Sequence, residues 1–286
     1  MVQQMQKPAQ RRRWGDAWSA LAIPGLVFIV LGFGSTLVFA IARSLTDPSP
    51  ANYLRLLDGV SGRALATTFQ SSIVIALIVL VMGYIYAYAM LIGPKWLKIY
   101  LIAFLAIQFA TSSVARAYAW VQLLQNNGVI NKFLMATGLI DHPLKLMRND
   151  LGAIIGTSHV LLPYMVLVLF ASMRQVNLTT IVAARSLGAN SWRALFEVFV
   201  PATRVGIVAG TGLVFVLGLS FYTTPALLGD ASHQMISALV MNQAMAYGDF
   251  GGASTLAMGL VIITLLSLLL TRMITDRLNL MRKPSS

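Results

Sequence analysis

The chain has 286 residues, of which 57% are hydrophobic and 10% are charged, and its mean hydropathy is +0.75. This composition excludes a soluble domain, because the surface of a soluble domain has to be hydrated. There is no cysteine, which excludes disulfides, thiolate nucleophiles and cysteine metal sites. The formal net charge of +12 does not indicate nucleic-acid binding, because the basic residues fall between apolar runs and form no basic face with interleaved aromatics.

The apolar residues are concentrated in six stretches, each long enough to cross a membrane. A spanning helix needs about 20 mostly apolar residues. The sequence therefore predicts an all-α, polytopic membrane protein with six transmembrane helices. The expected spans are 21–42, 67–91, 97–124, 151–173, 202–228 and 250–271.

The distribution of Lys and Arg predicts how these spans are oriented. Most of the 21 basic residues lie before the first span, after the last span, or in the connections on the same side of the membrane. Cytoplasmic segments carry this excess in membrane proteins. We therefore expect both termini in the cytoplasm, with an N-terminal segment over 1–20 and a C-terminal tail over 272–286.

The first span has a second interpretation. A basic run, Arg11 to Arg13, precedes it, and Ala40-Ile41-Ala42 near its end has the small residues of a signal-cleavage site. Its apolar run is about 20 residues long, whereas secretory signals have roughly 7–15. We therefore expect a retained first helix over 21–42. Cleavage would instead leave five spans and an N-terminus on the outside.

The segment 177–201 separates the fourth and fifth spans and is polar, yet it carries helical signals. Asn177 is suited to an N-cap, and Gly188 suits the left-handed position that follows a helix end. Asn190 or Ser191 is then placed to cap a second helix. The pattern predicts two short helices joined by a glycine turn on the cytoplasmic side.

This segment resembles the Glu-Ala-Ala loop of permease subunits of bacterial ATP-binding-cassette (ABC) importers. The resemblance rests on the Ala183-Ala184 pair, Gly188 and Pro201, whereas Val182 stands where that family usually has glutamate. It implies coupling helices that sit in a cleft of the ATP-hydrolysing subunit. The alternative is an amphipathic loop that lies on the bilayer surface. The residues implied to couple this chain to the ATPase are Val182, Ala183, Ala184, Arg185, Gly188, Ala189, Trp192 and Pro201.

Other motifs resemble the polyamine (spermidine/putrescine) type of these permeases. They include Arg116-Ala-Tyr118-Ala-Trp120 and the Phe-Tyr-Thr-Thr-Pro run that ends at Pro225. The resemblance implies a type I importer permease core over 65–271, located in the bacterial inner membrane. It implies two ATPase subunits, a second, homologous permease subunit and a periplasmic solute-binding protein as partners. The implied solute is a polyamine or a related amino-acid or opine-like compound, because sister systems share the pattern.

Four residues are candidates for the translocation path, namely Arg116, Tyr118, Tyr222 and Thr223. A charge inside a span costs on the order of 2.5–3.5 kcal/mol and is kept where it has a partner or faces a wet cavity. Arg116 therefore lines the path, holds a gate with an outer carboxylate such as Asp230, or snorkels to the headgroups. In the path it would repel a polyamine and favour a solute with a carboxylate. Tyr222 and Thr223 precede a proline break, which membranes tolerate beside protein or water.

The chain carries no motif for catalysis or ATP hydrolysis. It has no G-x-x-x-x-G-K-[ST] phosphate loop, and no nucleophile elbow surrounds Ser112 or Ser113. We therefore expect a transport subunit rather than an enzyme, with no cofactor or metal of its own. ATP and Mg²⁺ are expected on the partner ATPase subunit.

A different class of function, an ion- or proton-coupled secondary transporter, is the alternative. Such a carrier needs an intramembrane carboxylate and usually an inverted repeat, and the six stretches show neither. His159 in the fourth span is a candidate for a proton relay, or a hydrogen-bonded packing residue. The sequence favours the importer subunit.

Overall fold

The computed structural model describes residues 17–47, 49–57, 59–230 and 234–280. Most of the expected N-terminal segment, with Arg11 to Arg13, and the end of the tail at 281–286 lie outside the described residues. Within the described ranges every regular element is helical. The elements before the segment 177–201, the expected coupling segment, are α1 (Ala17–Thr46), the 3₁₀ helix η1 (Pro50–Leu57), α2 (Gly59–Ile92), α3 (Lys95–Ala110), α4 (Ser113–Leu124), α5 (Val129–Ala136) and α6 (Asp150–Met173).

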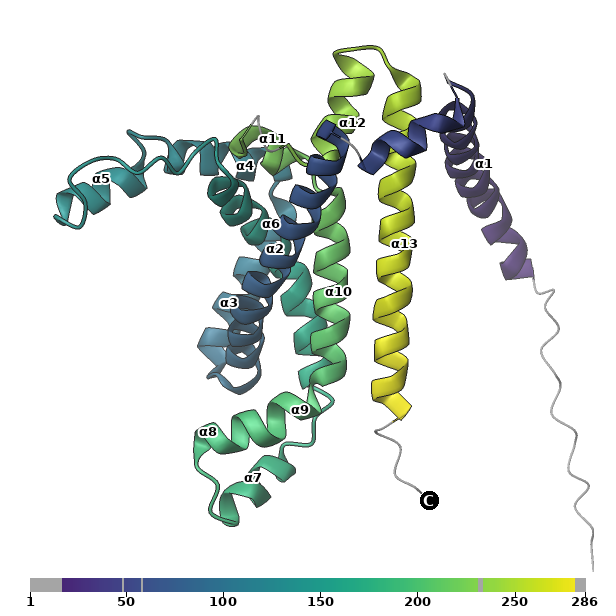
Figure 1. Ribbon diagram of the computed structural model, residues 1–286. Helices are drawn as coiled ribbons and strands as arrows, with labels where there is room; N and C mark the ends of the chain where they lie inside the picture. The colour runs from purple at the N-terminus through teal and green to yellow at the C-terminus, as the bar shows by residue number, and fades with distance from the viewer. Residues whose placement is uncertain (1–16, 48, 58, 231–233, 281–286) are drawn as a thin grey trace, which may run out of the picture.

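The remaining elements begin with four short helical pieces between α6 and the next long helix. They are α7 (Thr179–Ser186), α8 (Ser191–Arg193), the π-helix η2 (Ala194–Phe199) and α9 (Val200–Ala202). They are followed by α10 (Arg204–Ser220), α11 (Thr223–Leu228), α12 (Ile236–Met245) and α13 (Phe250–Leu280). In Figure 1, α7, α8 and α9 lie at one end of the molecule, and α4, α5, α11 and α12 lie at the other. The start of α1 and the end of α13 point toward the α7–α9 end, as the distribution of Lys and Arg predicts.

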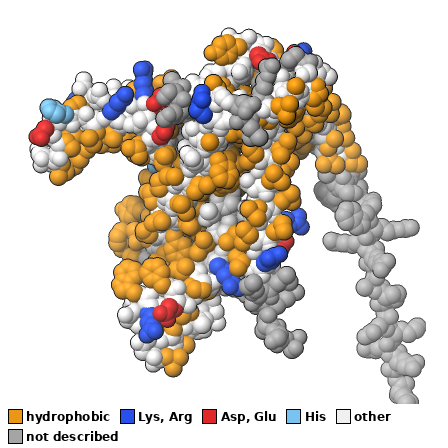
Figure 2. All heavy atoms as spheres, viewed as in Figure 1, with side chains coloured by type: hydrophobic (Ala, Val, Ile, Leu, Met, Phe, Trp, Pro, Cys, Tyr) orange, Lys and Arg blue, Asp and Glu red, His pale blue; other side chains and the backbone are white. Residues whose placement is uncertain are grey.

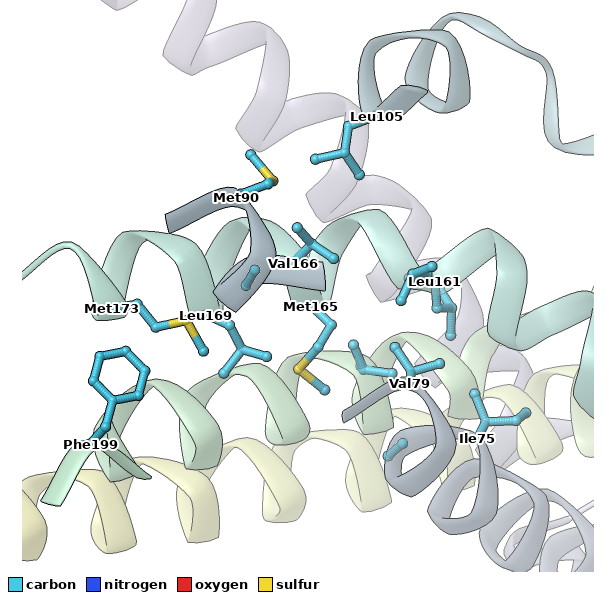
Figure 3. Close-up of a cluster of buried hydrophobic side chains, with 14 residues drawn as sticks. Ile75, Val79, Met90, Leu105, Leu161, Met165, Val166, Leu169, Met173 and Phe199 are labelled. Carbon is cyan, nitrogen blue, oxygen red and sulfur yellow. The ribbon is translucent and has the colours of Figure 1, made fainter. Parts of the chain in front are cut away.

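The core lies where α6 packs between α2 and α10. Met165 of α6 is fully buried, and both helices that face it present a glycine, Gly83 on α2 and Gly210 on α10. A Cβ at either glycine would lie only 2.7 Å from a Met165 side-chain atom. Small residues therefore let the three helices approach closely, as they do in other membrane proteins. Figure 3 shows Met165 and Leu169 among the buried side chains of this core.

The outside of the bundle is apolar. Four helical stretches are long and apolar enough to cross a membrane, and there are up to six if each of two bent helix pairs is one span. The four are Ile23–Thr46, Gly59–Ile92, Asp150–Met173 and Phe250–Leu278. Hydrophobic side chains cover most of the visible surface of the bundle, whereas Lys, Arg, Asp and Glu gather near its two ends (Figure 2). This is the distribution that a bilayer requires.

The expected third span, 97–124, is not one helix. The chain breaks at Thr111 and Ser112, which are extended, and the segments Lys95–Ala110 and Ser113–Ala136 are bent by 104°. The hydroxyl of Thr111 donates to the carbonyl of Ile107 (2.8 Å), so a nearby side chain supplies a hydrogen bond to a backbone carbonyl in the last turn of α3. Only α3 therefore runs along the bundle, and α4 turns across its outer end.

The expected fifth span, 202–228, is also interrupted. The segments Ser191–Ala202 and Arg204–Ser220 are bent by 67°, and α10 ends at Ser220, so that α11 is a separate short helix. The hydroxyl of Ser237 donates to the carbonyl of Phe221 (2.9 Å), which satisfies the backbone at the break. The irregular backbone is therefore in contact with protein, which is one condition under which such backbone is tolerated at membrane depth.

The first helix, α1, is anchored near its outer end. There Ser44 is fully buried, the hydroxyl of Tyr53 donates to Ser44 Oγ (2.8 Å), and Thr255 Oγ1 donates to the Ser44 carbonyl (3.4 Å). Large apolar side chains from Ile23 to Leu45 are exposed along the rest of the helix. Figure 1 shows α1 diverging from α13 below this anchor.

Candidate functional site

The segment 177–201 forms two helical arms joined by a glycine turn. Asn177 Oδ1 accepts hydrogen bonds from the backbone N–H (3.0 Å) and the hydroxyl (2.7 Å) of Thr179, where α7 begins. Gly188 has a φ of +92°, and Asn190 Oδ1 accepts from the N–H of Arg193 (2.8 Å), which caps α8. The local geometry is therefore the expected helix, glycine turn and second helix, with Asn190 rather than Ser191 as the cap.

This segment exposes large apolar side chains although it lies at the polar end of the molecule. The exposed fractions are 89% for Leu187, 70% for Trp192, 64% for Val182 and 60% for Phe196. The rings of Trp192 and Phe196 stack, with centroids 5.9 Å apart and planes at 11°. Several large apolar side chains exposed on one short segment are typical of an interaction site. We call Val182, Leu187, Trp192 and Phe196 the coupling surface.

The other predicted coupling residues lie in the same segment. Ala183, Arg185 and Pro201 are exposed, whereas Ala184 and Ala189 are partly buried. Leu187 and Phe196 were not among the predicted residues. Phe196 could have been found from its spacing, because side chains at i and i+4 on a helix are neighbours and Trp192 precedes it by four residues.

A polar cleft of about 750 Å³ opens at the opposite, outer end of the molecule. It lies between α2, the start of α6, α11 and α12, and Tyr222 is one of its lining residues. A second cleft of about 540 Å³ adjoins it. Both are lined by Thr67, Ser71, Asp150, Gln234 and Asn242.

Arg116 lies outside both clefts, at the corner between α3 and α4. Its guanidinium donates to Gln108 Oε1 (3.2 Å) and to Ser113 Oγ (3.4 Å). Gln108 Nε2 lies 2.6 Å from His159 Nε2, and the His159 ring meets the Trp120 ring edge-on with centroids 5.6 Å apart. The structure therefore joins Arg116 to α6 through Gln108.

The remaining path candidates are scattered. Tyr118 is exposed on α4, and Thr223 is the first residue of α11; neither lines the two clefts. Tyr222, at the break between α10 and α11, is the one of the four candidates that lines either of these two clefts. No group of three or more His, Cys, Asp or Glu residues in these ranges is placed to hold a metal ion.

The sequence pattern of the family described as "Binding-protein-dependent transport system inner membrane component" matches residues 94–280. The spermidine/putrescine transport system permease protein PotB of Salmonella typhimurium (strain SL1344) is 32% identical over 218 residues, which are 74% of this chain and 76% of the relative. PotB of Haemophilus influenzae is 27% identical over 253 residues, 85% of this chain and 88% of the relative.

A solved structure shows the same fold. One chain of a bacterial alginate ABC transporter, crystallised with an alginate pentasaccharide-bound periplasmic protein, has a TM-score of 0.77 and 16% identity. The match covers 91% of the present chain and 94% of the other. At that identity the likeness shows the fold alone.

The chain belongs to the family of inner-membrane components of binding-protein-dependent transport systems. It is the permease subunit of an ABC importer, an inner-membrane transport protein and not an enzyme. Subunits of this family work with an ATPase, so the energy for transport comes from another polypeptide.

Proposed function

We propose that this permease moves a small polar solute, a polyamine or a related amino-acid or opine-like compound, from the periplasm into the cytoplasm. The PotB relatives support this solute class. The complete importer would contain two ATPase subunits that bind ATP and Mg²⁺, this chain, a second, homologous permease and a periplasmic solute-binding protein. Residues 65–271 are proposed as the permease core.

The coupling surface is the observation that carries the proposal. Large exposed apolar side chains are typical of interaction sites. These four belong to the helix–turn–helix at the cytoplasmic end of the bundle, whose backbone Figure 1 shows. We assign the ATPase contact to this surface together with Ala183, Ala184, Arg185, Gly188, Ala189 and Pro201. Closure of the ATPase dimer would move the segment, and rigid-body motion of the attached helices would open the solute path.

The outer cleft is our candidate for the periplasmic entrance of that path. Tyr222 lines it directly, and Thr223 is the next residue along the chain. Arg116 and Tyr118 on α4 complete the proposed path in the assembled importer, where the second permease would face the corner between α3 and α4. A broken backbone and a charge at this corner both suit an aqueous or protein-filled surrounding rather than lipid.

Reconstitution tests the proposal. Proteoliposomes containing this chain, the second permease, the ATPase and the binding protein should accumulate labelled putrescine or spermidine only when ATP is supplied. The chain should also copurify with its ATPase subunit from detergent. A solute-stimulated ion flux through this chain alone, without an ATPase, would establish the secondary-transporter alternative instead.

A matched pair of probes decides the class of solute. Agmatine and arginine differ only by a carboxylate, so competition against putrescine uptake reports whether the importer accepts that group. Stronger competition by agmatine supports a polyamine. Stronger competition by arginine supports an amino-acid-like solute, as expected if the Arg116 guanidinium lines the path.

A further inference from the structure

The segment 177–201 is attached to the bundle at a specific joint. Phe199, the last residue of the π-helix η2, is fully buried. Its ring centroid lies 5.3 Å from that of Tyr88 and 6.5 Å from that of Tyr84, both edge-on and both on α2. Figure 3 shows Phe199 at the end of the row of buried side chains that includes Met173 and Leu169. Such edge-on pairs contribute beyond their buried area.

A hydrogen bond reinforces the aromatic contact. Thr203, also fully buried, is the residue between the two segments that bend by 67°. Its hydroxyl lies 3.0 Å from the hydroxyl of Tyr84 and 3.0 Å from the carbonyl oxygen of Val200, to which it donates. Because Thr203 Oγ1 donates to Val200, it accepts from the Tyr84 O–H. The bend between α9 and α10 is thus tied to α2 and not only to its own chain.

The rest of the segment is held less firmly. Neither α7 nor α8 has a fully buried residue, and the partly buried Ile181 and Leu195 pack against the same core. The π-helix that leads to Phe199 has one wide turn, in which the N–H of Val200 donates to the carbonyl of Leu195. Pro201 follows and has no N–H of its own. π-turns are rare and occur often at functional sites.

The helix on the other side of the joint reaches the outer cleft. α2 is one unbroken helix of 34 residues, with Tyr84 and Tyr88 near its inner end and Thr67 and Ser71 in the cleft lining. Seventeen residues separate Thr67 from Tyr84, a rise of about 25 Å. One unbroken helix therefore connects the residues that contact Phe199 and Thr203 to the lining of the cleft.

We propose that Tyr84, Tyr88, Phe199 and Thr203 form the joint through which the coupling segment moves α2, and that α2 carries the motion to the outer cleft. This inference rests on the proposed function and names positioning residues for it. None of the four side chains needs to touch solute or the ATPase. Their role is to keep the coupling segment and α2 moving as one body.

Two conservative substitutions test the joint in the complete importer. Tyr84→Phe removes the bond between the two hydroxyls, and Thr203→Val removes that bond together with the local bond to the Val200 carbonyl; both substitutions preserve shape. Each should lower the number of solute molecules imported per ATP hydrolysed by roughly two- to tenfold, the effect of one neutral hydrogen bond. The double variant should be no worse than Thr203→Val alone, because that substitution already removes the bond that Tyr84→Phe removes. Yield of the assembled complex and its basal ATPase rate should not change.

Tyr86→Phe is the matched control. Tyr86 lies on the same helix, but its hydroxyl donates to the carbonyl of Leu101 on α3 (2.7 Å). Its loss should leave the import-to-hydrolysis ratio at the value of the unmodified importer. The proposed joint is contradicted if the import-to-hydrolysis ratio is unchanged in Tyr84→Phe and Thr203→Val. It is also contradicted if the ratio falls equally in Tyr86→Phe.

A distance measurement tests the joint without any solute. The chain has no cysteine, so spin labels at Ile92→Cys on α2 and Glu197→Cys on η2, two residues before Phe199, report one distance. In the complex this distance should be the same with and without ATP, and it should change with ATP in Tyr84→Phe/Thr203→Val. An ATP-dependent distance in the otherwise unmodified chain refutes the joint. Absence of ATP-driven uptake of any solute would instead refute the proposed function.

Discussion

Gly188 sets the direction of the turn between α7 and α8. Its φ of +92° is unfavourable for a side chain, although a Cβ there would meet no atom within 4 Å. We expect Gly188→Val to strain the turn by about 1–2 kcal/mol. ATP-dependent uptake should fall roughly five- to thirtyfold if that strain opposes docking, and less ATPase should copurify with the chain.

Gly138→Val is the control for that change. Gly138 also has a positive φ, +71°, and open space around its Cβ position, but it follows α5 at the outer end of the molecule. The same kind of backbone strain placed there should not reduce the amount of copurified ATPase. Equal losses in both variants would show that strain in the chain, rather than the coupling turn, controls assembly.

Trp192 is the largest side chain of the coupling surface, and it stacks on Phe196. Aromatic residues buried at the centre of an interface often contribute 2 kcal/mol or more. We therefore expect Trp192→Ala to weaken ATPase binding about thirtyfold or more in a titration with the purified subunit. Trp96→Ala is the comparison, because Trp96 is similarly exposed but lies at the start of α3. Similar affinities for the two variants would remove Trp192 from the interface.

At the residue scale, the features that could be predicted are those formed by residues close to one another in the sequence. The cap at Asn190 and the turn at Gly188 are local and were predicted. Asn177 was predicted as the N-cap of the first short helix; the N-cap of α7 is Leu178, and Asn177 instead accepts from Thr179 just before it. The joint was not predicted, because Tyr84 and Thr203 are 119 residues apart. Phe199 lies within an apolar run, and nothing in its local sequence indicates that its ring will contact Tyr84 and Tyr88.

At the scale of elements, α12 shows how the outer cleft is held together. The N–H of Ile236, at the start of α12, donates to Thr68 Oγ1 on α2 (2.8 Å), and both residues are buried. Thr68→Val leaves that N–H without an acceptor and should cost about 1–3 kcal/mol of stability. Thr68→Ser keeps the acceptor. Hydrogen exchange in α12 should accelerate in the valine variant only; equal protection in both would contradict the cap.

The helical stretches were predicted more successfully than their interruptions. Counting apolar residues located the long helices, because a bilayer imposes that composition. It joined α3 to α4 across Thr111 and Ser112, since hydroxyl side chains that satisfy nearby backbone are tolerated inside apolar runs. It also missed α12, which has only 10 residues and whose cap on α2 is 168 residues away in the chain.

At the scale of the whole molecule, the absence of cysteine makes the topology directly measurable. Leu187→Cys and Leu139→Cys place single thiols at positions that are 89% and 70% exposed, at opposite ends of the bundle. A membrane-impermeant maleimide should label Leu139→Cys in intact cells with a permeable outer membrane. It should label Leu187→Cys only after the inner membrane is opened. The reverse pattern would place the coupling surface in the periplasm and exclude its role.

α3 is shorter than the expected span because it ends at Ala110, and this affects the lipid around the importer. Its 16 residues rise about 24 Å, whereas the hydrocarbon layer of a typical bilayer is about 30 Å thick. Wherever lipid contacts this helix, the acyl chains must compress or tilt to match the shorter length. We therefore expect growth conditions that lengthen acyl chains to increase the mismatch beside α3.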